Sequence, residues 1–333
     1  MVTIQDIANH LGIAVSTVSK GLNNASDISD STRQMVLDAA IELGYTPRKK
    51  RNLATPFEQK VCIIIENMDY MNKDTFTYDL VQGFQQHAFF SNWKVDIVPL
   101  SLNARSNYQY DAMLMTNHYS GAFWVGHSMH NDYSVQISKT RFPTVLFDNH
   151  FHNNKNIGYI GTDSYEGVKL ALTHLYDLGH RKIAFLNSTK SPTVSHDRAL
   201  AFERVMKELG IHIHSDLVEN GYYVPDCAKY HVPKFIDNGA TAIFCASDLI
   251  ASGAISEVTK RGLRVPQDIS IIGYDDLPFS SNLTPALTTI RQDRFNLGRC
   301  ACILLNNLIQ NIPISKYLLR PELVLRKSTC PPR

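Results

Sequence analysis

The N-terminal stretch TIQDIANHLGIAVSTVSKGLNN, residues 3–24, decides the fold of the first part of the chain. Thr3 followed by Asp6 fits a capping box at a helix start, and apolar residues then recur at helical spacing as far as Leu11. Gly12 ends this short helix, because glycine adopts the left-handed turn easily. The stretch therefore opens with a short, capped, amphipathic helix.

Two further helices complete a small helical head over residues 1–46. One is predicted over residues 15–22 and the other over about 31–43, closed by Gly44. The third helix is expected to turn these side chains inward: Met35, Val36, Ala39, Ala40 and Leu43. Two short helices braced by a third are typical of a helix-turn-helix. The outer face of the second helix, with small hydroxyls and one lysine, favours DNA binding; the alternative is a protein-docking module.

Together with STRQMVLDAAIELGYTP, residues 31–47, the opening stretch resembles the lactose-repressor (LacI/GalR) family of bacterial transcription regulators. In that family the second helix enters the major groove of DNA. The resemblance implies that Val15, Ser16 and Lys20 lie at base edges. It implies contacts nearer the DNA backbone for Thr3, Thr17, Ser19 and Asn23.

Two residues of the head depart from the usual family pattern, and a third weakens the second helix. Lys20 stands where the family usually has arginine, and lysine lacks the planar fork that discriminates guanine. Ala14 replaces the usual serine cap of the second helix, at a cost of about 1 kcal/mol. Gly21 adds a similar cost of about 1 kcal/mol, since glycine disfavours helix.

The strongest charge run, Arg48–Arg51, lies in the segment PRKKRNLATPFEQK, residues 47–60. Composition alone indicates a solvated linker over residues 47–59, but four adjacent cations beside a helix-turn-helix could also neutralise phosphates. In the family this segment forms a hinge helix in the minor groove, and the resemblance implies DNA contacts for Arg51 and Leu53. The leucine comes about one residue early and Pro56 limits a helix, so formation of the hinge helix stays open.

From residue 60 onward, short apolar strands alternate with amphipathic helices, which indicates parallel α/β sheets. The series is too long for one ordinary sheet, and a break near residues 153–162 divides it into two lobes. The predicted strands cover residues 61–65, 95–100, 121–126, 144–148, 182–187, 241–246 and 269–275. Two such lobes side by side form a cleft at the carboxyl ends of their strands, where open α/β sheets bind ligands.

The resemblance continues through most of the body. Its most specific stretch is residues 243–293, which carries GYDD at 273–276 and P-x-LTT from Pro285. The resemblance implies a periplasmic-binding-protein-like body of two doubly wound parallel-sheet lobes, joined to an all-α helix-turn-helix head. The effector-binding and dimerisation domain then spans residues 60–333. Its lobes comprise 60–159 plus 289–319, and 160–288 plus 320–333.

Polar residues at the predicted strand ends are the candidate effector contacts. The strand ends carry Asp148, Ser247–Asp248 and Asp275–Asp276, although Asp248 also fits an ordinary helix cap. The resemblance implies effector contacts for Arg198, Ser247, Asp275 and Gln292. A carboxylate can accept two sugar hydroxyls and an arginine donates in a fixed fork. The aromatic candidates for packing against a sugar ring, each also explicable as ordinary packing, are Phe76, Tyr78 and Tyr222 or Tyr223.

The resemblance implies a homodimeric repressor of operator DNA whose small-molecule effector, a sugar or sugar derivative, binds in the cleft. Ser247 stands where relatives often have asparagine, so a purine-type co-repressor remains an alternative ligand class. A second alternative is a cytosolic solute-binding protein, which the head disfavours. No run of leucines at heptad spacing follows residue 320, so a dimer is expected rather than a tetramer.

Composition limits the remaining function classes. The chain has 333 residues, 44% of them hydrophobic, and a formal net charge of only +2, so DNA binding requires a local patch. No apolar run approaches the roughly 20 residues of a membrane helix, and no signal sequence is recognised. Six scattered cysteines without a CxxC pair predict a cytoplasmic protein with reduced thiols and no metal site. Motifs of common enzymes and cofactors are missing, so no catalysis and no cofactor are expected.

Overall fold

The computed structural model describes residues 2–45, 59–100, 109–127, 132–151, 153–189 and 193–333. The chain divides into two compact units. Unit 1 comprises Met1–Met68, Phe84–Tyr159 and Arg299–Lys316. Unit 2 comprises Asp69–Gly83, Ile160–Gly298 and Tyr317–Arg333. The head, linker and lobe boundaries given above stay predictions beside this division.

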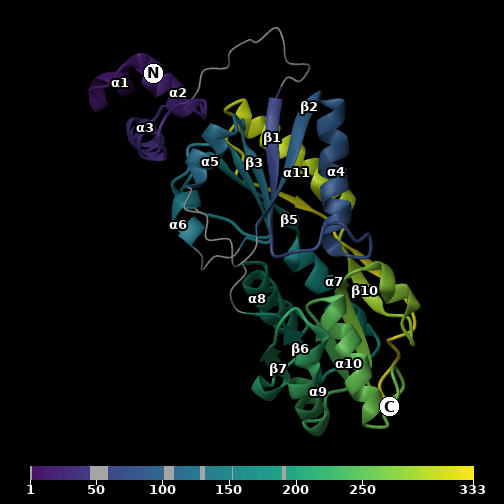
Figure 1. The fold of residues 1–333 in the computed structure, drawn as a ribbon. Coiled ribbons are helices and arrows are strands. Elements are labelled where there is room, and N and C mark those ends of the chain that lie inside the picture. The colour runs from purple at the N-terminus through teal and green to yellow at the C-terminus, as the bar shows by residue number, and fades with distance from the viewer. Residues whose placement is uncertain (1, 46–58, 101–108, 128–131, 152, 190–192) are drawn as a thin grey trace. The chain divides into compact units, whose positions relative to one another are not determined.

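The head consists of three helices, α1 (Ile4–Leu11), α2 (Val15–Leu22) and α3 (Asp30–Leu43), as the sequence predicted (Figure 1). Gly12 and Gly44 follow α1 and α3 with φ of 66° and 75°, the left-handed conformation that glycine adopts without strain. The apolar side chains of the three helices pack together in the head, among them Ile7, Val18, Val36 and Leu37.

One inward residue was predicted wrongly. Met35 is 39% exposed, whereas its neighbour Leu37 is 1% exposed and belongs to the core. Val36 and Ala40 already fill the middle of the inward stripe on α3, and Leu37 lies on the edge of that stripe. Met35 lies on the opposite edge of the stripe and is also apolar, so periodicity alone does not separate it from Leu37.

The first six-stranded sheet has the order β11-β5-β4-β3-β1-β2 and lies mostly in unit 1, while β5 from Ile160 and β11 from Tyr317 belong to unit 2. Its strands are β1 (Gln59–Glu66), β2 (Trp93–Leu100), β3 (Ala122–Val125), β4 (Thr144–Phe147), β5 (Ile157–Thr162) and β11 (Lys316–Leu319). The helices between these strands are α4 (Phe76–Phe90), whose residues as far as Gly83 belong to unit 2, α5 (Tyr110–Thr116) and α6 (Asp132–Ser138). β1 pairs in parallel with β2 and β3, and β3 with β4, so their carboxyl ends share one edge.

Unit 2 carries a second six-stranded sheet with the order β12-β10-β9-β8-β6-β7. Its strands are β6 (Ile183–Asn187), β7 (Val218–Asn220), β8 (Ala242–Cys245), β9 (Ser270–Asp275), β10 (Thr288–Arg291) and β12 (Glu322–Val324). The helices are α7 (Ser164–Asp177), α8 (Thr193–Glu208), α9 (Ala228–Asp237), α10 (Asp248–Lys260) and α11 (Arg294–Ile309), the last reaching into unit 1. Strand β12 is antiparallel to β10, and the pairs β6–β7, β6–β8, β8–β9 and β9–β10 are parallel.

The predicted fold class is confirmed, with an α-helical head and two doubly wound, mostly parallel sheets. All seven predicted strands form. Short strands without an apolar run were missed, namely β5, β7, β10, β11 and β12. Strand β5, for example, reads IGYIGT, and its two glycines weaken the strand pattern although every residue in it is buried.

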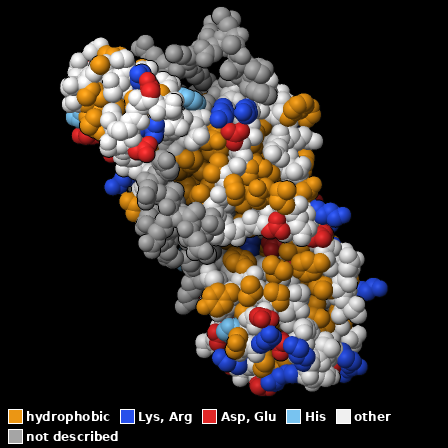
Figure 2. Space-filling model, viewed as in Figure 1, with side chains coloured by type: hydrophobic (Ala, Val, Ile, Leu, Met, Phe, Trp, Pro, Cys, Tyr) orange, Lys and Arg blue, Asp and Glu red, His pale blue; other side chains and the backbone are white. Residues whose placement is uncertain are grey.

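Charge is mixed on the visible surface of unit 2. Figure 2 shows Lys and Arg side chains among Asp and Glu near the C-terminus. Such interspersed charge leaves no single-sign field there, in keeping with a net charge of only +2. Within the described ranges, no helix combines the length and apolar character needed to cross a bilayer.

Candidate nucleic-acid interface and effector site

Helix α2 presents a polar outer face on a packed head. Val18, Gly21 and Leu22 are buried on its inner face. Val15 and Ser16, predicted at base edges, are exposed at its start, as is Lys20 in its last turn. Thr17 and Ser19 are half-buried. Because the inner face is fully used in packing, the outer face is available for a partner.

Ala14 and Gly21, which were both expected to weaken α2, have different structural outcomes. Ala14 is the N-cap of α2 and makes no side-chain capping hydrogen bond. Gly21, by contrast, lies where a Cβ atom would come within 2.9 Å of Cβ and Cγ1 of Val36. The glycine therefore allows α2 to approach α3 closely, a packing reason that the sequence pattern did not reveal.

Several predicted DNA contacts already have partners in the head. The Thr3 hydroxyl and backbone N–H donate to the Asp6 carboxylate at 2.8 and 2.7 Å, and these bonds lower the pKa of Asp6. The Asn23 amide donates to the carbonyl oxygen of Ser19 at 2.7 Å. Lys20 forms an ion pair with Asp27, at 2.5 Å between Nζ and Oδ2. Arg51 and Leu53 lie outside the described residues, so their contacts stay predictions.

In unit 2, the carboxyl ends of neighbouring strands bring two predicted effector residues together. The Gln292 amide, immediately after β10, donates to the Asp275 carboxylate at the end of β9, at 2.7 Å between Nε2 and Oδ1. Gln292 is 3% exposed. Asp275 and Asp276 both have positive φ, 117° and 52°, which non-glycine residues rarely adopt. The chain thus makes a constrained turn at this strand end.

Arg294 holds this turn in place. Its Nη1 donates to the backbone carbonyls of Asp275 and Asp276, both at 2.9 Å. Its Nη2 donates to Oδ2 of Asp79, in the first turn of α4, also at 2.9 Å. The predicted aromatic Phe76 lies beside this pair, with the Arg294 Cζ 5.9 Å from its ring centroid. Tyr78, also in the first turn of α4, is half-buried.

Asp276 is held by two further arginines. Its Oδ2 accepts from Arg291 at 2.7 Å, and its Oδ1 accepts from Arg326 at 2.6 Å. Around these residues lies a hollow of about 380 Å³, whose charged lining includes Asp79, Asp276, Arg291, Arg294, Arg320 and Glu322. The cations of this lining are paired with acids, so the hollow favours a neutral polar ligand over an anion.

Arg198, the predicted effector arginine on α8, is 2% exposed. It donates from Nη1 to the backbone carbonyl of Ala246 at 2.7 Å, and its guanidinium lies 3.9 Å from the centroid of the Tyr274 ring. A cation packed against an aromatic face inside a domain keeps its orientation. Arg198 is therefore fixed between the ends of strands β8 and β9.

The sequence favoured Asp248 as the cap of α10, but Ser247 holds that position. The effector role of Ser247 stays a prediction. Ser247 is the N-cap of α10, and its hydroxyl accepts from the backbone N–H of Ile250 at 3.2 Å. Asp248 lies fully buried in the first turn and accepts from the Leu277 backbone N–H and the Ser280 hydroxyl, at 2.8 and 2.6 Å. It also accepts from the Thr289 hydroxyl at 2.5 Å.

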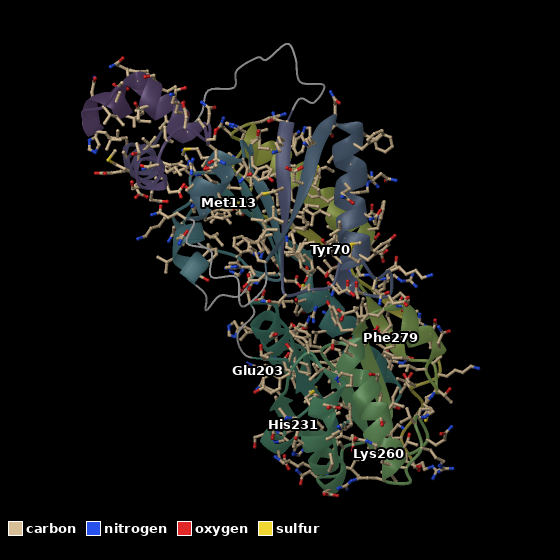
Figure 3. All side chains as sticks on the ribbon, in the orientation of Figure 1. Tyr70, Met113, Glu203, His231, Lys260 and Phe279 are labelled. Carbon is tan, nitrogen blue, oxygen red and sulfur yellow. The ribbon has the colours of Figure 1, made fainter. Side chains whose placement is uncertain are left out.

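Asp248 consequently ties together the segments that follow β9 and form β10. The 3-10 turn Pro278–Asn282, marked by Phe279 in Figure 3, carries Ser280. Burial, followed by the nearby charge of Asp275, raises the pKa of Asp248 to about 7. Through Leu277 and Ser280, Asp248 holds the segment that follows the Asp275–Asp276 turn.

The remaining predicted effector residues follow other strands. Tyr222 is 67% exposed in the connection after β7, whereas the neighbouring Tyr223 bonds through its hydroxyl to that of Ser195 at 3.2 Å. Asp148 follows β4 in unit 1, with a φ of 57°. The cleft expected between the two lobes stays a prediction.

A polar cluster at the ends of β6 and β7 was missed. The hydroxyls of Ser188 and Ser195 lie 2.5 Å apart, and the Asn187 amide donates to the Ser195 carbonyl at 3.0 Å and to Asn220 at 3.3 Å. The signal was present in the sequence, since Asn187 and Ser188 follow an apolar run just as Asp275 does. Within the described ranges, no three His, Cys, Asp or Glu side chains meet as a metal site.

Comparisons with known proteins agree with this architecture. Residues 3–48 match the family described as bacterial regulatory proteins, lacI family, and residues 172–329 match the periplasmic binding protein-like domain. The HTH-type transcriptional repressor PurR of Pasteurella multocida (strain Pm70) is 30% identical over 334 residues, which cover 98% of each chain. The HTH-type transcriptional repressor CytR of Escherichia coli (strain K12) is 26% identical, over 98% of this chain and 96% of that protein.

The solved structures give the same result. The lac repressor dimer bound to operator and the anti-inducer ONPF superposes with a TM-score of 0.68 at 26% identity, covering 99% of both chains. The transcriptional regulator CelR–cellobiose complex superposes with a TM-score of 0.74 at 22% identity, over 98% of this chain and 100% of that chain, and shows the fold. The chain therefore belongs to the lacI family of bacterial regulatory proteins.

Proposed function

We propose that the protein is a homodimeric transcriptional repressor that binds operator DNA through α2 and responds to a small-molecule effector. The observation that carries the proposal is the exposed polar face of α2 on a head whose inner face is fully packed. The family match over residues 3–48 and the relatives named as transcriptional repressors support it.

The chemistry of α2 suits base-edge reading. Ser16 can donate or accept at a base edge, Lys20 can reach guanine acceptors, and Val15 can contact a thymine methyl group. Thr3, Thr17, Ser19 and Asn23 then lie nearer the phosphates, with Arg51 and Leu53 as the proposed hinge contacts. Two heads in a symmetric dimer would read a pseudo-palindromic site, because protein symmetry is mirrored in the half-sites.

The proposed effector site in unit 2 is the surface at the carboxyl ends of β8, β9 and β10. Asp275, Gln292 and Arg198 combine a carboxylate, an amide and a guanidinium, which together match the alternating donors and acceptors of a polyol. Phe76 offers an aromatic face beside Arg294, which donates to the Asp275 carbonyl. A sugar or sugar derivative is therefore the proposed ligand class, and Ser247, the N-cap of α10, is a further proposed contact.

The effector changes operator affinity only by its differential affinity for the two states of the repressor. An inducer binds the DNA-free state better, whereas a co-repressor binds the operator-bound state better. A gel-shift titration at fixed salt, with a panel of sugars and a panel of purines, tests the proposal and its sign. We expect a sugar to change the apparent Kd for a duplex that the wild-type chain selects from random sequences. Failure to bind any duplex selectively would overturn the repressor assignment, and a response to purines alone would overturn the ligand class.

A further inference from the structure

We propose that Asp27 restrains Lys20 in the free protein and thereby limits the affinity of the head for DNA. This inference rests on the proposed function, in which the outer face of α2 binds DNA. It concerns an acidic residue outside α2, to which the family resemblance assigned no role.

The ion pair occupies the cation that α2 offers to DNA. Lys20 is the single basic residue in VSTVSKGL, the sequence of α2. Its Nζ lies 2.5 Å from Oδ2 of Asp27, in the connection between α2 and α3. The two side chains are 47% and 58% exposed. The pair is therefore on the surface, where a DNA phosphate or base could compete for the ammonium group.

The connection that carries Asp27 is also held by contacts other than the ion pair. The backbone N–H of Ala25 donates to the Lys20 carbonyl at 3.0 Å. The carbonyl of Ala25 in turn accepts from Nη2 of Arg33 at 2.8 Å, and Arg33 is anchored by Asp30. Asp27, two residues after Ala25, is thus presented to Lys20 by a fixed loop. The hydrogen bond from Lys20 lowers the pKa of Asp27, so its carboxylate is charged at neutral pH.

The ion pair lowers the affinity of the head for DNA in two ways. Lys20 must give up its partner before its compact ammonium group contacts a guanine or a phosphate. The freed carboxylate then adds a negative charge beside the phosphate backbone. An exposed pair is worth up to about fivefold in an equilibrium constant, and one neutralised phosphate is worth about threefold between 50 and 200 mM salt.

The test measures DNA affinity of the full chain by fluorescence anisotropy at 50 and 200 mM salt. Two duplexes are used, one selected by the wild-type chain from random sequences and one of random sequence and equal length. Asp27→Asn should bind both duplexes about three- to tenfold more tightly at low salt, with a steeper salt dependence. Asp38→Asn makes the same charge change at an exposed position on α3 that accepts hydrogen bonds from the amides of Gln34 and Gln109 rather than from a cation. It should gain less than about twofold.

A double substitution separates the pair from bulk charge. In the Lys20→Met background, Asp27→Asn should give no more than the gain of the Asp38→Asn control. Equal gains from Asp27→Asn with and without Lys20, or a loss of affinity in Asp27→Asn, would overturn the inference. A wild-type chain that selects no sequence would contradict the proposed function, and Asp27 would still be judged on the random-sequence duplex.

Discussion

The side-chain amide of Gln292 donates a hydrogen bond to the carboxylate of Asp275, with 2.7 Å between Nε2 and Oδ1. The two residues meet because β9 and β10 pair in parallel, with Arg291 opposite Asp275. The next residue, Gln292, then reaches back across the strand ends. The family resemblance implied an effector role for each residue separately, and the structure shows them as one hydrogen-bonded pair.

Replacing Gln292 with glutamate tests this pair. A second carboxylate at hydrogen-bond distance from Asp275, in a position only 3% exposed, should lower the free energy of unfolding by about 2 kcal/mol at pH 8. Near pH 5 the two carboxyl groups can share a proton, so the loss should shrink. Gln292→Met, which removes the hydrogen bond without adding charge, should show no such pH dependence. Thermal unfolding at both pH values is the measurement, and wild-type stability of Gln292→Glu at pH 8 would show that the two side chains are not held together.

The raised pKa of Asp248 predicts that the free energy of unfolding falls as pH rises. Burial raises its pKa to about 7, above the ordinary value of 3.8, so the folded chain binds this proton more tightly than the unfolded chain. The proton-linked stabilisation is complete below pH 4 and is lost as pH rises towards about 7. Asp248→Asn does not titrate, so its stability relative to wild type should improve steadily from pH 4 to 8. Urea unfolding across this range is the check, and a constant difference between the two proteins would contradict the assignment.

The lowered pKa of His180 predicts the opposite, a free energy of unfolding that rises with pH. Its Nε2 donates to the carbonyl of Cys330 at 2.9 Å, and Nδ1 then accepts from the hydroxyl of Thr241, also at 2.9 Å. Burial lowers its pKa below 6.5, so the unfolded chain binds the proton more tightly than the folded chain. The stabilisation is present above pH 6.5 and is lost as pH falls through the lowered pKa. His180→Gln should flatten the acid side of the stability profile, and an unchanged profile in urea unfolding would contradict this role.

Gly21 predicts a packing defect in the head. Alanine favours helix over glycine by about 1 kcal/mol, but its Cβ would lie 2.9 Å from two side-chain atoms of Val36. Such overpacking costs about 1–3 kcal/mol, so Gly21→Ala should lower both head stability and DNA affinity. Val36→Ala should partly rescue it, because the clashing Cγ1 is removed. DNA binding of Gly21→Ala and of the double variant Gly21→Ala/Val36→Ala is the measurement. Tighter binding by Gly21→Ala would show that helix propensity outweighs packing.

Much of the fold could be predicted because capping residues, turn residues and apolar periodicity indicated the same elements. All three head helices carry apolar stripes, and α1 and α3 also carry side-chain caps and glycine ends. The seven predicted strands are apolar runs between turn residues. Met35 and Leu37 were exchanged because periodicity does not decide between two apolar residues at opposite edges of one stripe. The strands that were missed lack such runs, and β12 has only three residues.

The site was less readable, since its contacts join residues far apart in the chain. Asp248 and Thr289 are separated by 41 residues, and no spacing rule relates them. Asp248 was expected to cap α10, whereas Ser247 does so, because either type of side chain can cap a helix. The closeness of Gly21 to Val36 likewise depends on how two helices pack, which periodicity does not specify.

The central claim is that the outer face of α2 reads a defined DNA sequence. The most direct measurement compares the wild-type chain with Ser16→Ala/Lys20→Ala, each allowed to select duplexes from a random pool and then titrated on the recovered sequence. We predict that the wild-type chain recovers a two-fold symmetric motif and that the substituted chain, folded as shown by circular dichroism, loses at least tenfold in affinity for it. Recovery of the same motif with equal affinity by both proteins would contradict the claim.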